Sequence, residues 1–112
     1  MHYVVTSVDV HGRIGDRTPL RRLGWEPGQP VSISLAGRAI VVGNEPGSPA
    51  TVTRQGYLRL PASVRHTLRL QPGDRLLVAS HFDAGKLVAY PTAVLDQMLL
   101  AYQSTNQPGA PE

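Results

Sequence analysis

The chain has 112 residues, 41% of them hydrophobic, with one Phe, one Trp and no Cys. This length suits a single domain with an aliphatic core, and the lack of Cys excludes disulfides, thiolate nucleophiles and cysteine-based zinc sites. The net charge is only +3, no apolar run reaches the ~18 residues of a membrane span, and residues 1–6 lack the pattern of a secretory signal, so we expect a cytoplasmic chain with no membrane partner.

The first half of the chain predicts a strand, a short helix and a β-hairpin. Residues 3–10 are rich in β-branched side chains and end at a Gly turn. Residues 17–23 suit a short helix, with Thr18 as N-cap and Pro19 at the first helical position. Residues 31–35 alternate with a period of two, and residues 38–42 return after a Gly turn as the second strand of a hairpin.

The second half predicts the same elements again, after a linker rich in Gly and Pro at 43–49. Strands are expected at 50–54 and 57–60, and Pro61 can open a short helix that ends near Leu68. The second hairpin is expected from 75–80 and 86–90.

A helix at 92–103 follows, with Thr92 as N-cap, and residues 104–112 are expected to be a disordered tail. The helix has no counterpart in the first half. Its apolar residues fall on one face, which must be covered either by the rest of the same chain or by the same helix of a second chain. These residues are Val94, Leu95, Met98, Leu99 and Tyr102.

The halves are an internal repeat. Gly12–Val42 and Gly56–Tyr90 share the order Gly, apolar residue, Arg-bearing segment, Leu-x-x-x-Pro-Gly, apolar strand, Gly-basic, apolar strand. The offset between equivalent residues grows from 44 to 45 in the helical segment and to 48 in the hairpin. Two copies are too few for a solenoid, so we expect a single pseudo-twofold object over residues 1–103, with copy one at 3–43 and copy two at 50–90.

Arginine is segregated along the chain. Lys and Arg together number 11, and eight of the arginines lie in the two equivalent segments that follow the first strand of each copy. Residues 54–69 contain no Asp or Glu, and residues 12–22 contain only Asp16. A solvated face or coding bias would explain a preference for Arg over Lys but not this segregation. The pattern favours a basic face for a polyanion.

Copy two resembles the swapped-hairpin DNA-binding domain of the AbrB, MazE and SpoVT group. The resemblance lies in the segments 52–65 (VTRQGYLRLPASVR) and 68–76 (LRLQPGDRL), and copy one looks like a degenerate member at 8–14 and 20–28. It implies a mainly β fold: a swapped-hairpin (double-split) β-barrel built from two tandem pseudo-symmetric copies with short helices, plus the C-terminal helix. Copy one lacks the Leu-Pro step, and copy two has Tyr57 where Arg is usual, so the two half-sites are unlike.

The resemblance also implies that the short helices and Gly loops at one end of the barrel face double-stranded DNA. A guanidinium can grip phosphate, or guanine O6 and N7, with two donors at once. Tyr57 could stack or bond to a phosphate, but an aromatic residue after a turn is more often a packing residue. The expected DNA-binding residues are Arg13, Arg17, Arg21, Arg22, Arg54, Arg59, Arg65, His66 and Arg69.

No catalytic or cofactor pattern is present in the sequence. The four His residues lack paired metal-ligand spacing, and there is no Gly-x-Ser-x-Gly, Gly-x-Gly-x-x-Gly or P-loop segment. We therefore expect no enzyme, no metal and no cofactor. The leading hypothesis is a sequence-preferring DNA-binding protein, a transcriptional regulator that acts by binding alone. The alternative is an antitoxin-type module that binds promoter DNA and also a protein partner through its C-terminal segment.

Overall fold

The computed structural model describes residues 1–106, without the side chains of Met98 and residues 103–106. The elements are β1 (His2–Ser7), α1 (Thr18–Arg22), β2 (Val31–Ala36), β3 (Ala39–Asn44), α2 (Ala62–Leu68), β4 (Arg75–His81), β5 (Lys86–Pro91) and α3 (Thr92–Asn106). The expected hairpins and short helices are confirmed. The last helix runs beyond its expected end at residue 103 to Asn106, and the rest of the expected tail, 107–112, lies outside the described residues.

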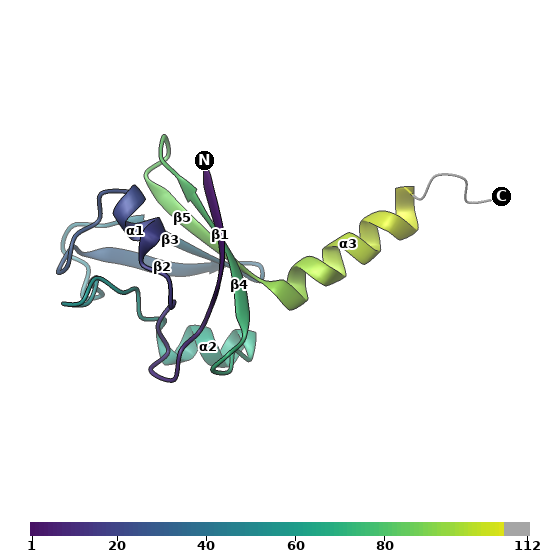
Figure 1. The fold of residues 1–112 in the computed structure, drawn as a ribbon, viewed down its shortest axis with the longest axis horizontal. Coiled ribbons are helices and arrows are strands. Elements are labelled where there is room, and N and C mark those ends of the chain that lie inside the picture. The colour runs from purple at the N-terminus through teal and green to yellow at the C-terminus, as the bar shows by residue number, and fades with distance from the viewer. Residues whose placement is uncertain (107–112) are drawn as a thin grey trace.

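The five strands form one antiparallel sheet in the order β1-β4-β5-β3-β2 (Figure 1). The fold is therefore mixed α/β and mainly β, as expected. The sheet is open, because β1 and β2 are edge strands, and no barrel is detected among residues 1–106. The closed barrel that the resemblance implied is thus not seen.

Strands from the two halves pair with each other at two places in this sheet. β1 from the first half pairs with β4 from the second, from His2 opposite Ser80 to Ser7 opposite Arg75. At the centre, β3 pairs with β5 from Ile40 opposite Ala89 to Gly43 opposite Lys86. Each half therefore contributes a strand whose hydrogen-bonding partner belongs to the other half.

The contacts themselves repeat. The N–H of Val8 donates to the Asp74 carbonyl at 2.9 Å, and the equivalent N–H of Val52 donates to the Gln29 carbonyl at 3.0 Å. A second pair of backbone hydrogen bonds is equivalent in the same way. The Gly73 N–H donates to the Val8 carbonyl at 2.7 Å, and the Gly28 N–H donates to the Val52 carbonyl at 2.8 Å. The internal repeat of the sequence is thus also a repeat of hydrogen bonds.

The first strand is less regular in copy two. The strands expected at 50–54 and 57–60 are reduced to isolated bridges, of Thr51 with Pro30 and of Arg59 with Arg13. The segment that would extend the first of these strands backwards is the linker, where Pro46 and Pro49 have no N–H to donate to a ladder. In copy one the equivalent positions belong to β1.

Helix α1 begins differently from the expectation. Thr18 is the first helical residue and Arg17 is the N-cap, with no side-chain capping bond of its own. Instead the Asp16 carboxylate accepts the N–H of Thr18 at 2.8 Å, because a short acidic side chain just before a helix can satisfy one of its unpaired donors. Pro19 lies in the first turn, as expected.

The core is aliphatic and draws on both halves. Val8, Ile14 and Leu20 from copy one are buried, as are their equivalents Val52, Leu58 and Val64 from copy two. Trp25, the single Trp of the chain, is also buried. Burying these side chains from both copies in one cluster is what fixes the two halves on each other.

Helix α3 projects away from the sheet (Figure 1). Val94 and Leu95 are half-buried near its start, whereas Leu99 and Leu100 are exposed by 59% and 63%. Of the two ways in which its apolar face could be covered, packing of Leu99 on its own domain is therefore not observed. Among the described residues, no helix is long and apolar enough to cross a membrane.

The two copies differ at one backbone position where a stability test is possible. Arg69 ends α2 in the left-handed region, with φ of 55°, where copy one has Gly24 with φ of 75°. A side chain in this conformation costs about 1 kcal/mol, so we expect Arg69→Gly to raise the free energy of unfolding by about that amount. Gly24→Ala should lower it similarly, because an added Cβ there meets nothing within 4 Å and only the backbone conformation is tested. Urea unfolding of both variants measures this, and the absence of a gain for Arg69→Gly would contradict it.

Candidate nucleic-acid interface

Two equivalent turns begin the site. In copy one the Asp9 carboxylate accepts the N–H groups of His11 and Arg13, both at 2.9 Å. In copy two the Thr53 hydroxyl oxygen accepts the N–H of Tyr57, also at 2.9 Å. Both turns close through a Gly in the left-handed region, Gly12 and Gly56. A side-chain oxygen and a glycine therefore place the residue after each turn, Arg13 or Tyr57, in an equivalent position.

These equivalent residues lie against each other where the halves join. The Arg13 guanidinium carbon is 4.0 Å from the centre of the Tyr57 ring, and that of Arg17 is 5.0 Å away. The backbones are tied nearby, since the Ile14 N–H donates to the Leu58 carbonyl at 2.9 Å. Two cations on one aromatic ring are held by its negative face. Tyr57 thus holds two arginines of copy one, Arg13 and Arg17. Its position after a turn in the sequence did not predict this role.

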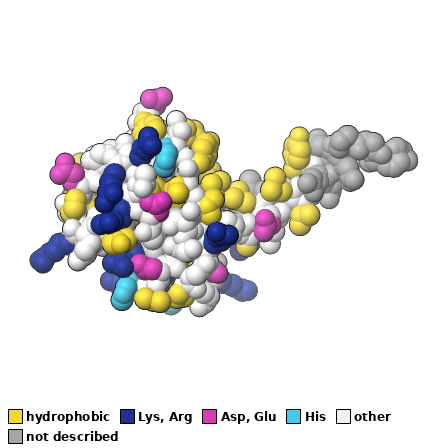
Figure 2. Space-filling model, in the orientation of Figure 1, with side chains coloured by type: hydrophobic (Ala, Val, Ile, Leu, Met, Phe, Trp, Pro, Cys, Tyr) yellow, Lys and Arg dark blue, Asp and Glu magenta, His cyan; other side chains and the backbone are white. Residues whose placement is uncertain are grey.

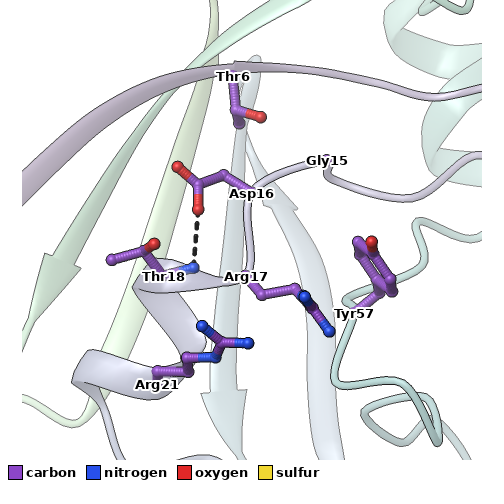
Figure 3. A pocket seen from close by; sticks show the side chains of 7 residues that line it. All are labelled: Thr6, Gly15, Asp16, Arg17, Thr18, Arg21 and Tyr57. Carbon is purple, nitrogen blue, oxygen red and sulfur yellow. Dashed lines mark hydrogen bonds between the residues drawn. The ribbon is translucent and has the colours of Figure 1, made fainter.

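A polar hollow of about 350 Å³ opens beside this contact (Figure 3). Arg17 reaches from the start of α1 towards Tyr57, and its Nη1 donates to the Gln55 carbonyl at 2.9 Å. Arg21 lies one turn along α1, on the same hollow. The complete lining is Thr6, Gly15, Asp16, Arg17, Thr18, Arg21 and Tyr57.

Two carboxylates of this region are held in the charged form. Desolvation raises the pKa of Asp9, but the N–H groups of Arg13 and His11 and the Arg13 guanidinium outweigh it and hold this pKa below its ordinary value of 3.8. The N–H of Thr18 lowers the pKa of Asp16, aided by the Thr18 side chain and the nearby charges of His2 and Arg21 and opposed by desolvation. Both are therefore anionic near neutral pH, and each orders a turn that carries an arginine.

Arg65 is partly engaged inside the chain. Its Nε donates to the Leu60 carbonyl at 3.1 Å, and it lies so close to the first turn that a Cβ on Gly12 would come within 2.8 Å of this Nε. Arg65 therefore connects α2 to the Gly12 turn, and only the terminal nitrogens of its guanidinium are available to bind a ligand. This structural role is absent from the sequence expectation.

The remaining expected residues lie on the surface. Arg21, Arg22, Arg54, Arg59, His66 and Arg69 are exposed, and Arg13, Arg17 and Arg65 are half-buried. Within residues 1–106 the only ion pair joins Arg13 to Asp9, at 2.7 Å. Basic side chains gather over α1 and the neighbouring end of the sheet, with a few acidic ones between them (Figure 2).

Not all nine residues come together. Arg69 lines a different hollow, with Arg38, Arg75 and the first turn of α3. His66 lies on α2, which is at the other end of the domain from α1 (Figure 1). The structure thus brings Arg13 and Arg17 together at Tyr57, with Arg21 on the same hollow, and leaves the others elsewhere on the surface.

Sequence reasoning missed the residues that hold the arginines, namely Asp9, Asp16, Thr53, Gln55 and the ring of Tyr57. One signal was present. Asp9 and Thr53 both stand three residues before a Gly, the spacing of turns that a side-chain oxygen closes.

Comparison with protein-family models, with curated proteins and with solved structures finds no match for this chain.

The lowered pKa of Asp9 makes the first turn sensitive to acid. A carboxyl whose pKa is lower in the folded state adds stability above its unfolded pKa and loses it as pH falls through the folded value. We expect Asp9→Asn to lower the free energy of unfolding by about 1 kcal/mol near neutral pH, and this difference to vanish in strong acid. Urea unfolding from about pH 6 to about pH 2 tests it, with the exposed Asp83→Asn as control. A difference that persists unchanged at the lowest pH would contradict the prediction.

Proposed function

We propose that the chain binds double-stranded DNA with sequence preference and acts as a transcriptional regulator by binding alone. The observation that carries the proposal is the placing of Arg13 and Arg17 against the ring of Tyr57 at the junction of the two halves, with Arg21 on the hollow beside them. Exposed arginines of both copies flank it, and within the described residues Arg21, Arg22, Arg54 and Arg59 have no ion pair.

This arrangement suits a polyanion because most of its positive charges are unpaired: Arg13 pairs with Asp9, but Arg17 and the exposed arginines form no ion pair among the described residues. Phosphate contacts by Arg supply affinity that falls with salt and fix the register of the protein on the duplex. The few guanidinium groups that reach base edges would supply the preference for a sequence.

We further propose that the fold is a single-chain version of the swapped-hairpin barrel of the AbrB, MazE and SpoVT group. Support comes from the exchange of strands between halves and from the repeated hydrogen bonds of Val8 and Val52. The bridge of Thr51 with Pro30 is the counterpart of the pair Ser7 with Arg75. In this proposal, the isolated bridges of copy two replace the regular strand pairing that β1 makes with β4.

The test of DNA binding is its salt dependence. We expect Arg54→Ala and Arg59→Ala each to weaken binding to a duplex and to flatten the slope of log K against log salt by roughly one unit, if each contacts a phosphate. Arg38→Ala, in the exposed turn between β2 and β3, removes the same charge elsewhere and should leave the slope unchanged. Fluorescence anisotropy with a labelled duplex measures both quantities. Absence of binding at low salt would overturn the proposed function.

The partner of helix α3 is proposed to be the same helix of a second chain. Leu99 and Leu100 are exposed on a helix whose main contacts with its own chain are with β4 and β5. A dimer would present two basic faces and raise the apparent affinity for DNA through bivalent binding.

We expect Leu99→Asp to turn a dimer into a folded monomer, because it places a charge in an apolar contact. Gln97→Asp, an exposed position on the same helix, is the matched control and should remain a dimer. Light scattering at several concentrations measures the mass. A wild-type chain that is monomeric at all concentrations would contradict the dimer and favour the antitoxin-type alternative, in which α3 binds another protein.

A further inference from the structure

We propose that the hollow beside Tyr57 binds one backbone phosphate of the duplex and that it makes the chain bind DNA in a single orientation. The inference deepens the proposed function and rests on it. It concerns a property that a protein with two identical halves lacks, because a twofold protein on a duplex can be turned by 180° without changing its contacts.

The hollow offers donors for an anion. One N–H of Arg17 is held by the Gln55 carbonyl, which leaves four of the five donors of its guanidinium. The Arg21 side chain is exposed, and its guanidinium makes no hydrogen bond or ion pair among the described residues. Thr6 and Tyr57, which carry hydroxyl groups, line the same hollow, as does Thr18, whose side chain interacts with Asp16. A phosphate is the anion whose several oxygens match such a spread of donors.

The Asp16 carboxylate is the one opposing charge of the lining. It is oriented by its bond with the N–H of Thr18, at 2.8 Å, and so serves to begin α1 (Figure 3). Two guanidinium groups against one carboxylate leave the hollow net positive. The ring of Tyr57 also orients the Arg17 side chain, whose guanidinium carbon lies 5.0 Å from the ring centre.

The equivalent positions of the second half carry different residues. At the offset of 44 residues, Arg17 is replaced by Pro61, and Asp16 is replaced by the buried Leu60. The one arginine that is kept, Arg65, donates instead to the Leu60 carbonyl. The lining residues that are replaced at the equivalent position are, in full, Thr6 (by Ala50), Gly15 (by Arg59), Asp16 (by Leu60), Arg17 (by Pro61), Thr18 (by Ala62) and Tyr57 (by Arg13).

The phosphate contact is tested by neutralising single phosphates of a duplex. A duplex site is first selected from a random pool with the full chain, and methylphosphonates are then placed at each position in turn. We expect one phosphate whose neutralisation weakens binding roughly tenfold, and we expect this loss to disappear in Arg17→Gln/Arg21→Gln. Arg21→Gln alone, at an exposed position, keeps the Arg17 bond to Gln55 and should lose part of the effect. Arg38→Gln is the charge-matched control and should keep it all.

The orientation is tested with a tethered DNA-cleaving reagent. The chain has no Cys, so one introduced Cys is the only attachment point. His11 and Gln55 are equivalent, exposed positions on the two turns. We expect His11→Cys and Gln55→Cys to cut opposite sides of the selected site, each on one side only.

The outcomes separate the two proposals. Failure to select or bind any duplex would overturn the proposed function. Binding with cleavage on both sides by each probe, or with the same methylphosphonate losses in the double variant as in the wild type, would overturn the hollow as the orienting site while leaving DNA binding intact. Equal binding of inorganic phosphate and duplex in direct competition would assign the hollow to a free anion instead, and would also overturn it.

Discussion

The structure depends on hydrogen bonds that neither half of the chain can make alone. Among the described residues, β4 is the only strand that pairs with β1, and β3 joins the sheet to β5 across the centre. Because buried backbone groups without a hydrogen-bond partner are strongly unfavourable, this pairing holds the two halves together. The turns at Gly12 and Gly56 and the arginines after them are placed by this pairing, which is why the candidate site lies where the halves meet.

Repetition and divergence are divided between the interior and the surface. Equivalent buried positions keep apolar side chains, as in Ile14 and Leu58. Equivalent turns keep a left-handed Gly, as in Gly28 and Gly73. The surface has diverged: at the positions equivalent to most arginines of one copy, the other copy has a different residue type. A homodimer could not diverge in this way, because each substitution would appear in both halves at once.

Much of the fold could be predicted from the sequence, because period-two strands and Gly turns are local signals. The repeat also predicted which segments are equivalent. It could not predict that equivalent residues touch, as Arg13 and Tyr57 do, because a spacing of 44 residues carries no information on distance in space. The cap of α1 by Asp16 and the anchoring of Arg65 on Leu60 were missed for a related reason, since each depends on a side-chain rotamer and not on a pattern. The basic segments were evident, but which of their arginines gather around one ring was not.

The long span between β1 and its partner has a consequence for synthesis of the chain. His2 pairs with Ser80, so the first strand to leave the ribosome waits until most of the sequence has been translated. The β2–β3 hairpin, whose strands are joined by a tight turn, can close much earlier. The hairpin can therefore form before β1 has a partner, and β1 can join the sheet only once β4 has been synthesised. Nascent chains that stop before β4 carry an unpaired β1, and an unpaired strand edge favours aggregation.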